Sequence, residues 1–372
     1  MPLPEKQGVG SSILPLATEF LSLSLKITTK ITLMKKVLIL LGFFIFACGG
    51  FSEETTVEDT IIVQDKSQLF NSVVTNYEII DILKPDENYG SRAYASIIKV
   101  DSEYIIFYSA RTNNEYSIFR NSSNDLETFD NKNEIQIIPN ITNAYNFQHV
   151  YVPYVFYEND MYYMILTSRK YNEDRFEAIH IATSKDSFEW EINLEPILIP
   201  EYQWEGNEVE NFGVIKVDDT YFLNFESTGP TKLQAERSIG IAYSNDLANW
   251  KKISDTPQIV DKKFDEGVYC ASFFSYNNEV YLIVPNLYRF KIYKFTDFNN
   301  LSEDDFIGYF VPYDRSKNIV IDTPEVITND INKEVFLNEK FYLAFSSTRY
   351  GGWNVEGIVF RDVNEFLNQL QK

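Results

Sequence analysis

From about Tyr89 to the C-terminus, short apolar and aromatic stretches alternate with polar turns, and one phrase of this pattern occurs five times. Each copy is an aromatic-rich segment that follows a short polar turn, and its marker aromatic falls at Tyr104, Tyr162, Tyr221, Tyr281 and Phe341. The successive steps between these positions are 58, 59, 60 and 60 residues. A nearly constant period of this kind marks a repeat architecture.

The repeating unit is rich in Tyr, Phe, Val and Ile and is broken by Asn, Asp and Ser, a composition typical of several short antiparallel strands. Five such sheets arranged radially predict an all-β fold, a five-bladed β-propeller of four-stranded antiparallel blades over residues 76–372. This prediction overrides the prior from length, because about 150 residues per domain would suggest two or three separate domains.

A second motif recurs later in the unit, where Ser-x-Asp is followed by an aromatic residue. Clear copies lie at 123–129, 184–190 and 244–250, and weaker ones at Asp297 and Asp362. The aspartate can accept backbone N–H groups in a tight turn while the aromatic ring packs between sheets. We therefore interpret these turns as structural.

The N-terminal part carries a targeting pattern. Met34 is followed by two lysines and an apolar run over 37–46, then by Ala47 and Cys48, as in a secretory signal peptide over 34–48. A run this short is a poor membrane span. The end of the segment resembles the lipobox of bacterial lipoproteins, although Phe46 is bulkier than usual there. The resemblance implies lipidation at Cys48 and a lipid anchor in the membrane of a bacterial cell envelope.

The flanking segments fit this interpretation. Residues 1–33 contain prolines and acids and do not look like the start of a signal peptide, so we expect a mis-assigned upstream segment and a true start at Met34. Residues 49–75 are polar and acidic, which predicts a flexible tether.

Charge and composition exclude several functions. The net charge of −21 argues against a nucleic-acid partner. With Cys48 lipidated, Cys270 remains alone and no internal disulfide can form. Two separate histidines and no clustered ligand motif give no support for a metal site. We expect no cofactor and a monomer.

In a propeller whose blades begin with the innermost strand, the starts of those strands converge around the axis. Counting back from each repeated aromatic places them at Arg92–Tyr94, His149–Tyr151, Glu208–Glu210, Tyr269–Cys270 and Asp330–Asn332. Alternate residues of a strand point to the same side, so Glu208 and Glu210 can act together. His149 is equally compatible with a site or a structural role, whereas His180 lies in a strand pattern and is expected to be packed.

Arginines recur where the next strand should return to the same rim. With Arg92, they form a predicted ring of up to five guanidiniums: Arg111, Arg169, Arg289 and Arg349. Arginine is well suited to bidentate capture of carboxylate, sulfate or phosphate, which suggests an anionic saccharide as ligand. The alternative is that these arginines only pair with neighbouring carboxylates.

Several aromatic residues also fall near the predicted strand starts or rims, where a flat ring can stack on a sugar. They are Tyr94, Tyr151, Trp204, Tyr269 and Trp353. Core packing is the default for any one of them.

The five blades, the phrase at 152–168 and the turns at 182–190 and 242–250 resemble the five-bladed propeller glycoside hydrolases, a group that includes arabinanases, xylosidases, invertases and mannoside phosphorylases. The resemblance implies catalysis by carboxylates on different blades. Glu210 aligns with a functional carboxylate of the third blade, and Glu208 is the neighbouring candidate. Two blades depart from the pattern. In the first, Arg92–Tyr94 stands where an aspartate before a proline is expected, and in the fourth the expected acid position falls near Tyr269 and Cys270.

The missing acid must then come from elsewhere, and the nearest acids are Asp86, Glu87, Asp265 and Glu266. On this basis we expect a glycoside hydrolase that cleaves an oligo- or polysaccharide outside the cytoplasm. One alternative is a glycan-binding lipoprotein without catalysis, favoured by the departure in the first blade. The other is a phosphorylase, in which an arginine-lined pocket binds inorganic phosphate.

Overall fold

The computed structural model describes residues 77–84, 91–112, 115–127, 129–130, 134–138, 147–170, 176–231, 237–260, 268–313, 317–328, 331–335, 339–350 and 352–371. All of them belong to one compact unit, residues 66–372. The predicted signal peptide, the lipidation site Cys48 and the segments on either side of it (1–33 and 49–75) lie outside the described residues. No helix in the described part of the chain is long and apolar enough to cross a membrane.

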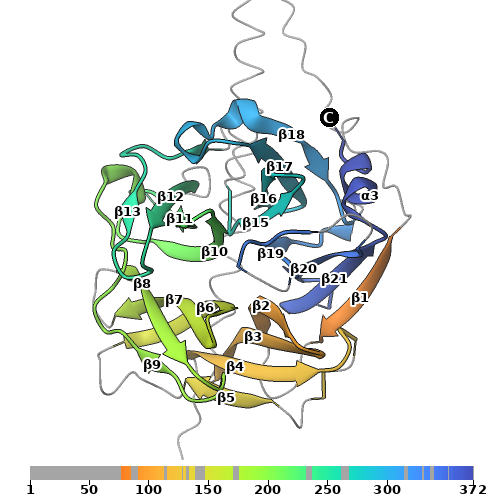
Figure 1. The fold of residues 1–372 in the computed structure, drawn as a ribbon, viewed down its shortest axis with the longest axis horizontal. Coiled ribbons are helices and arrows are strands. Elements are labelled where there is room, and N and C mark those ends of the chain that lie inside the picture. The colour runs from red at the N-terminus through yellow and green to blue at the C-terminus, as the bar shows by residue number, and fades with distance from the viewer. Residues whose placement is uncertain are drawn as a thin grey trace, which may run out of the picture. The chain divides into compact units, whose positions relative to one another are not determined.

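Five antiparallel sheets surround a central axis, and the predicted all-β, five-bladed propeller is confirmed (Figure 1). Blade 1 contains β2 (Arg92–Val100), β3 (Glu103–Thr112), β4 (Glu115–Ser123) and β5 (Ile135–Ile138). Blade 2 contains β6 (Phe147–Glu158), β7 (Met161–Lys170), β8 (Glu177–Ser184) and β9 (Glu191–Ile192). Blade 3 contains β10 (Glu210–Val217), β11 (Thr220–Ser227), β12 (Ser238–Ser244) and β13 (Lys251–Lys252), and β14 (Ile259–Val260) also pairs with β12.

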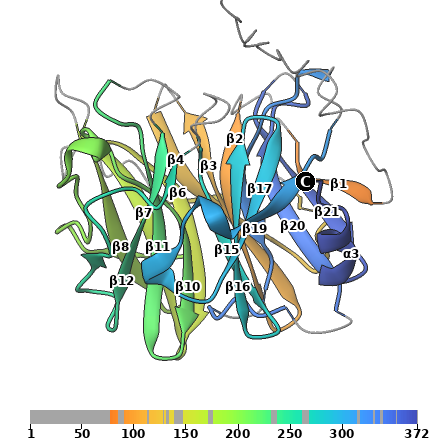
Figure 2. The ribbon, with the colours of Figure 1, turned by 90° about the horizontal axis from the view of Figure 1, so that it is seen from above.

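Blade 4 contains β15 (Ser272–Tyr276), β16 (Glu279–Asn286), β17 (Arg289–Phe295) and β18 (Phe306–Phe310). Blade 5 is built from both ends of the unit: β19 (Ile321–Val326), β20 (Phe341–Ser347), β21 (Asn354–Phe360) and, as its outermost strand, β1 (Glu78–Leu83). One α-helix, α3 (Val363–Asn368), and three short 3-10 helices, Gln203–Glu205, Phe298–Asn300 and Glu303–Asp305, complete the described elements. In each blade the strand named first above (β2, β6, β10, β15 or β19) lies nearest the axis (Figure 1), and Figure 2 shows from the side that the strands run roughly along this axis.

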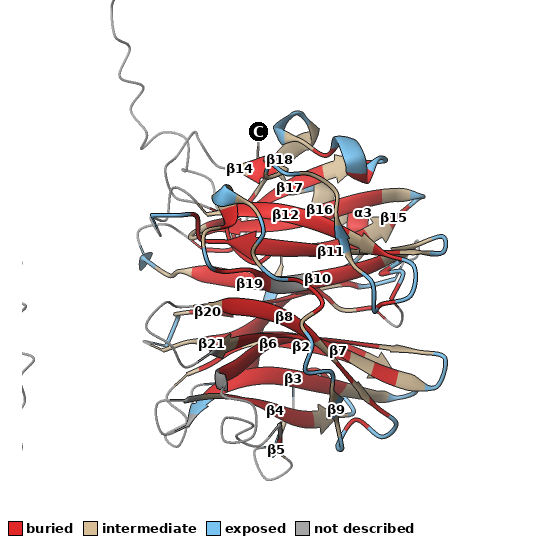
Figure 3. Cartoon of the chain, turned by 90° about the vertical axis from the view of Figure 1, so that its left-hand side faces the viewer, coloured by how far each residue is buried: buried red, intermediate tan, exposed pale blue. Residues whose placement is uncertain are grey.

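The core is divided among the interfaces between blades. Side chains on alternate positions of a strand face opposite neighbours, so that Val214 of β10 packs toward blade 2 while Ile215 packs toward blade 4. A buried apolar cluster fills the space between each pair of adjacent blades. The strands are accordingly buried along most of their length, and exposure is concentrated in the turns (Figure 3).

The structural interpretation of the Ser-x-Asp turns agrees with their contacts. In the blade 2 turn the Asp186 carboxylate accepts the backbone N–H groups of Phe188 and Glu189. The Trp190 indole donates to the carbonyl of Ser187. These backbone N–H donors lower the pKa of Asp186.

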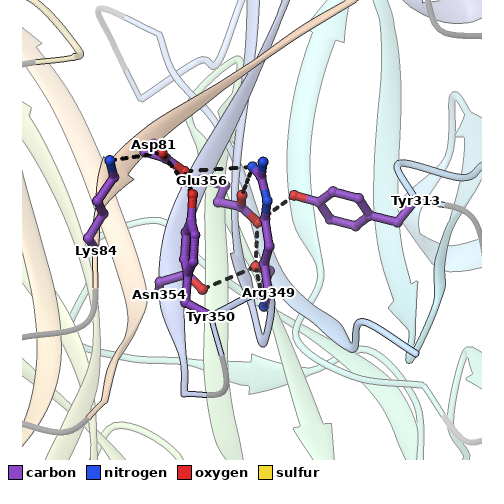
Figure 4. Close-up of polar contacts among 8 residues, drawn as sticks. Asp81, Lys84, Tyr313, Arg349, Tyr350, Asn354 and Glu356 are labelled. Atoms are coloured by element: carbon purple, nitrogen blue, oxygen red, sulfur yellow. Dashed lines mark hydrogen bonds and ion pairs between the residues drawn. The ribbon is translucent and has the colours of Figure 1, made fainter. Parts of the chain in front are cut away.

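Ring closure depends on β1, which pairs antiparallel with β21 from Glu78 opposite Val359 to Leu83 opposite Val355. A polar network reinforces this pairing (Figure 4). The fully buried Glu356 of β21 accepts hydrogen bonds from Tyr313, Ser347 and, at 2.8 Å, Arg349. Asp81 of β1 accepts a hydrogen bond from the hydroxyl of Tyr350 at 2.8 Å. The turn after β20 is thereby tied to the closing strand.

We predict that Arg349→Ala lowers the free energy of unfolding by about 2 kcal/mol, because it leaves the buried Glu356 carboxylate without its cation while two hydroxyl donors remain. Urea denaturation measures the change. Arg361→Ala is the matched control, since Arg361 forms an exposed pair with Asp362, and its effect should stay within about 0.5 kcal/mol. Equal effects of the two substitutions would contradict the role assigned to Glu356.

Candidate functional site

A pocket of about 330 Å³ opens at the end of the axis where the innermost strands begin. Its lining combines three acids and two arginines with aromatic rings and one thiol: Tyr94, Tyr116, Tyr151, Arg169, Glu210, Glu226, Arg237, Tyr269, Cys270, Asp322 and Trp353. The size falls within the usual range for small-ligand sites. Convergence of the strand starts, as predicted, therefore produces a polar pocket.

Inner-strand bulges direct side chains into this pocket. The register shifts between Ala93 and Ser96 in β2, between Tyr151 and Tyr154 in β6, and between Asp322 and Glu325 in β19. The bulges contain residues with positive φ: Tyr94 at 55°, Val152 at 52° and Thr323 at 49°. Such conformations cost energy for residues other than glycine and persist only where their surroundings enforce them.

Hydroxyl groups from the preceding blade hold two of these bulges. The Tyr94 N–H donates to Ser346 Oγ at 3.1 Å, and the Val152 N–H donates to Ser109 Oγ at 2.9 Å. In blade 5 the Thr323 N–H donates to the Asp322 carboxylate at 2.7 Å. The neighbouring blade thus fixes where the pocket side chains point.

Asp322 is a pocket acid whose pKa lies well above its ordinary value. Burial raises the pKa of this carboxyl to about 6, although the Thr323 N–H, the Cys270 thiol and Arg237 oppose the shift. Cys270 Sγ also lies 3.7 Å from Glu226 Oε2, so one thiol lies beside two acids. Burial, together with the charges of Asp322 and Glu210, raises the pKa of Cys270, which keeps it a neutral thiol.

The other two pocket acids are held by specific partners. Glu210, at the start of β10, accepts a hydrogen bond from the Tyr151 hydroxyl at 3.2 Å. Glu226 of β11 forms an ion pair with Arg237. Burial and the nearby Glu210 raise the pKa of Tyr151 well above its ordinary value, so its phenol stays protonated and able to donate.

Two further acids, Glu177 and Glu208, lie behind Glu210. Oxygen atoms of all three carboxylates lie within 4.8 Å of one another, and all three residues are buried. Glu177 is paired with Arg169, and Glu208 accepts a hydrogen bond from Thr228 Oγ1 at 2.9 Å. Each of these carboxylates therefore already has a partner within the fold.

The structure brings together part of the predicted set. Among the residues singled out from the sequence, Tyr94, Tyr151, Arg169 and Glu210 line the pocket, as do Tyr269 and Trp353. Trp204 instead packs on Phe225 in the core between blades 2 and 3. Asp86, Glu87, Asp265 and Glu266 lie outside the described residues, so their proposed catalytic part stays a prediction.

The remaining predicted residues lie away from the pocket lining. Arg92 is buried and pairs with Glu134 at 2.8 Å, and Arg349 pairs with Glu356. Arg289 stacks on Tyr309, and Arg111 is exposed with its guanidinium 6.0 Å from the Tyr116 ring centre. The sequence predicted Arg289 at the end of the second strand of blade 4, but it is the first residue of the third strand, β17.

Both histidines make contacts within the fold. His149 is buried and accepts the Tyr116 N–H at 3.2 Å, and its ring meets the Tyr116 ring edge-on. His180 is packed, as expected, with Nδ1 3.1 Å from the carbonyl oxygen of Asn193.

The predicted start of the fifth blade at Asp330–Asn332 is wrong. The inner strand β19 begins at Ile321, and counting back from Phe341 falls within the unusually long β19–β20 connection. For comparison, only two residues separate β10 from β11. Asp322 was missed for this reason, although Asp-Thr-Pro at 322–324 could have marked a bulged strand start, where proline is tolerated.

Glu226 and Arg237 were also missed. Glu226 falls five residues after the repeated aromatic, where the other blades carry Ser109, Thr167, Asn286 and Ser346. An acid at a position otherwise occupied by neutral polar side chains was a detectable departure. No comparable signal pointed to Arg237.

Comparisons with known proteins agree with this architecture. Residues 137–286, from the end of β5 through β16, match the model of the β-1,4-mannooligosaccharide phosphorylase family. This segment is less than half of the chain; it includes Glu210, Glu226 and Arg237 and excludes Asp322. A search of curated proteins found no match.

Solved structures share the fold at low sequence identity. BT0996, solved as a complex with RGII, has a TM-score of 0.62 at 13% identity, over 79% of this protein and 92% of that one. A family 117 glycoside hydrolase, Zg3597 from the marine bacterium Zobellia galactanivorans, has a TM-score of 0.54 at 13% identity, over 77% and 90%. The α-L-arabinofuranosidase PaAbf62A from Podospora anserina, in complex with cellotriose, has a TM-score of 0.54 at 12% identity, over 76% and 96%.

These findings confirm the predicted resemblance to five-bladed propeller glycoside hydrolases and support a carbohydrate-active enzyme.

The perturbed acid predicts a pH dependence of stability. Because the pKa of Asp322 rises from 3.8 to about 6 on folding, the native state favours the protonated form, and stability is lost as the pH rises through this window. The loss should total about 3 kcal/mol in the wild type and be absent from Asp322→Asn. Urea denaturation of both proteins below pH 4 and above pH 6 measures the difference. Parallel pH profiles would rule out the perturbed acid.

Proposed function

We propose that this protein cleaves a glycosidic bond in the axial pocket, with Asp322 as the general acid and Glu210 as the second carboxylate. The observation that carries the proposal is the difference between the two acids. Burial raises the pKa of Asp322 to about 6, whereas Glu210 accepts a hydrogen bond from a phenol. Two carboxylates in contrasting environments are the usual basis for acid and base roles in glycoside cleavage.

In this mechanism Asp322 donates its proton to the leaving glycosidic oxygen as the bond to the anomeric carbon breaks. Glu210 either activates water on the opposite face or attacks as the nucleophile, and the anomer of the product distinguishes the two. Glu226 is a positioning residue, because its ion pair with Arg237 places a guanidinium beside the pocket. In this proposal Asp322 is the general acid for which the sequence offered no residue at the expected position.

The aromatic lining supports a sugar ligand. Tyr94 and Tyr151 meet edge-on with ring centres 6.2 Å apart, and Tyr116 stacks on Tyr151 at 5.7 Å. Together with Tyr269 and Trp353 they give the pocket flat apolar surfaces beside its acids. Such surfaces suit the C–H faces of a sugar ring while the charged groups bind its hydroxyls.

Location is part of the proposal. The lipobox-like segment at Cys48 supports a protein anchored in the envelope of a bacterial cell and acting there on an oligo- or polysaccharide. The alternative is a glycan-binding lipoprotein without catalysis, which would bind the oligosaccharide and not cleave it.

We predict that Asp322→Asn and Glu210→Gln each lower the cleavage rate by about a thousandfold, because each removes a group that transfers a proton or contacts the reacting carbon. Product chromatography against a panel of oligosaccharides measures the rate. Asp101→Asn is the matched control: it changes an exposed acid whose positive φ asparagine tolerates. Binding that persists without cleavage in the wild type would instead identify a glycan-binding protein.

The rate of cleavage should also decline as the pH rises above about 6, because Asp322 must hold its proton to act as the acid. The pH dependence of kcat/KM measures this step in the free enzyme. A rate that keeps rising toward alkaline pH would exclude Asp322 as the general acid.

A further inference from the structure

We infer that the axial pocket binds an uncharged glycoside and uses water, and not inorganic phosphate, as the group that receives the glycosyl unit. This inference rests on the proposed function and refines it. The juxtaposition that carries it is the pairing of each pocket arginine with a carboxylate more deeply buried than itself. Among the described residues of the lining, both arginines are therefore already paired with carboxylates.

Arg169 is the first of these cations. Its Nε donates to Glu177 Oε1 at 2.5 Å, and the Glu177 side chain is fully buried whereas 21% of the Arg169 side chain is exposed. A third group, the Tyr151 hydroxyl, lies 3.4 Å from the same guanidinium. An incoming anion would have to share Arg169 with a carboxylate that water cannot reach, which weakens the binding of the anion.

Arg237 follows the same arrangement on the other side of the pocket. It forms an ion pair with Glu226, of whose side chain 1% is exposed, and its guanidinium lies 4.9 Å from the centre of the Tyr269 ring. Glu226 therefore compensates the charge of Arg237, and the Tyr269 ring covers one face of its guanidinium. Of the arginines predicted to capture anions, three likewise pair with acids whose side chains are buried: Arg92, Arg169 and Arg349.

The charge of the lining points the same way. With Asp322 protonated, Glu210 and Glu226 face two guanidiniums in the described lining, and the buried acids Glu177 and Glu208 have oxygen atoms within 4.8 Å of Glu210. An anion in the pocket would meet this acidic surplus at short range in a protein of net charge −21. Sugar hydroxyls, in contrast, can donate to these carboxylates without a charge penalty.

The inference separates this chain from the activity named by the matching family model. Phosphorolysis needs a phosphate dianion held beside the anomeric carbon, whereas hydrolysis needs only a water molecule. In hydrolysis the glycosidic C–O bond breaks and a new C–O bond forms from water. Asp322 protonates the leaving oxygen. The proton from water passes to Glu210 when water attacks directly, or back to Asp322 when water opens a glycosyl–Glu210 intermediate, and in both cases the products are two free sugars.

The test uses the full chain, with and without millimolar phosphate, on neutral oligosaccharides. We expect the rate to be independent of phosphate and the products to be free sugars. Phosphate-dependent cleavage, or a sugar phosphate as product, would overturn the inference while leaving glycosidic cleavage in place. If nothing is cleaved, the proposed function fails, and the pocket charge is tested by binding alone.

Calorimetry supplies that binding test with inorganic phosphate and with matched neutral and uronic methyl glycosides. We expect Glu177→Gln, which releases Arg169 from its partner, to bind phosphate at least about tenfold more tightly than the wild type.

Glu189→Gln, an exposed substitution in the same blade, is the control and should not change phosphate binding. Glu226→Gln releases Arg237 and repeats the test if Glu177→Gln does not fold. Wild-type preference for the uronic glycoside, or no gain in phosphate affinity in either variant, would overturn the inference.

Discussion

The pairing of β1 with β21 is the constraint on which the rest of the structure depends. Each described blade buries its two faces against its neighbours, so no blade has a core of its own. The interface between blades 5 and 1 exists because β1 contributes Ile80, Ile82 and Leu83 to it. Only a closed ring brings β2, β6, β10 and β19 to one axis, and the pocket is lined from the starts of these strands. The function proposed for the pocket is therefore a consequence of closure.

Closure also concentrates polar groups where water is scarce. Carboxylates in such a place require partners, and the structure supplies them in three forms: a guanidinium for Glu226, a phenol for Glu210 and hydroxyls together with Arg349 for Glu356. Asp322 receives weaker compensation, and burial dominates its pKa. Acid catalysis needs a carboxyl that keeps its proton at a higher pH than an ordinary acid does, and Asp322 keeps its proton up to about pH 6 because its charge is incompletely compensated.

Much of the fold could be predicted from the sequence, because a period of about 60 residues repeats wherever a strand must occupy the same place in a blade. Four inner-strand starts were predicted to within three residues in this way. The method failed for blade 5, where the long connection before Phe341 breaks the spacing and conceals Asp322. The repeat does not predict the partner of an arginine either, because ion pairs such as Arg169 with Glu177 join residues on different strands. Glu226, in contrast, could have been predicted, because it is an acid at a repeat position that carries neutral polar residues in the other blades.

The excess of acids also explains why arginines of the predicted ring pair with carboxylates of the protein itself. Acids outnumber basic residues by 54 to 33, and strand pairing places Arg169 directly opposite Glu177. In such a chain an arginine at a strand end meets a carboxylate of its own blade before it meets any ligand, and burial of that carboxylate makes the pair expensive to separate. Arginine content near a pocket is therefore a poor guide to the charge of a substrate. The pairing of each arginine is the better guide, and in the described lining both arginines are paired with carboxylates, which favours an uncharged sugar and a water molecule.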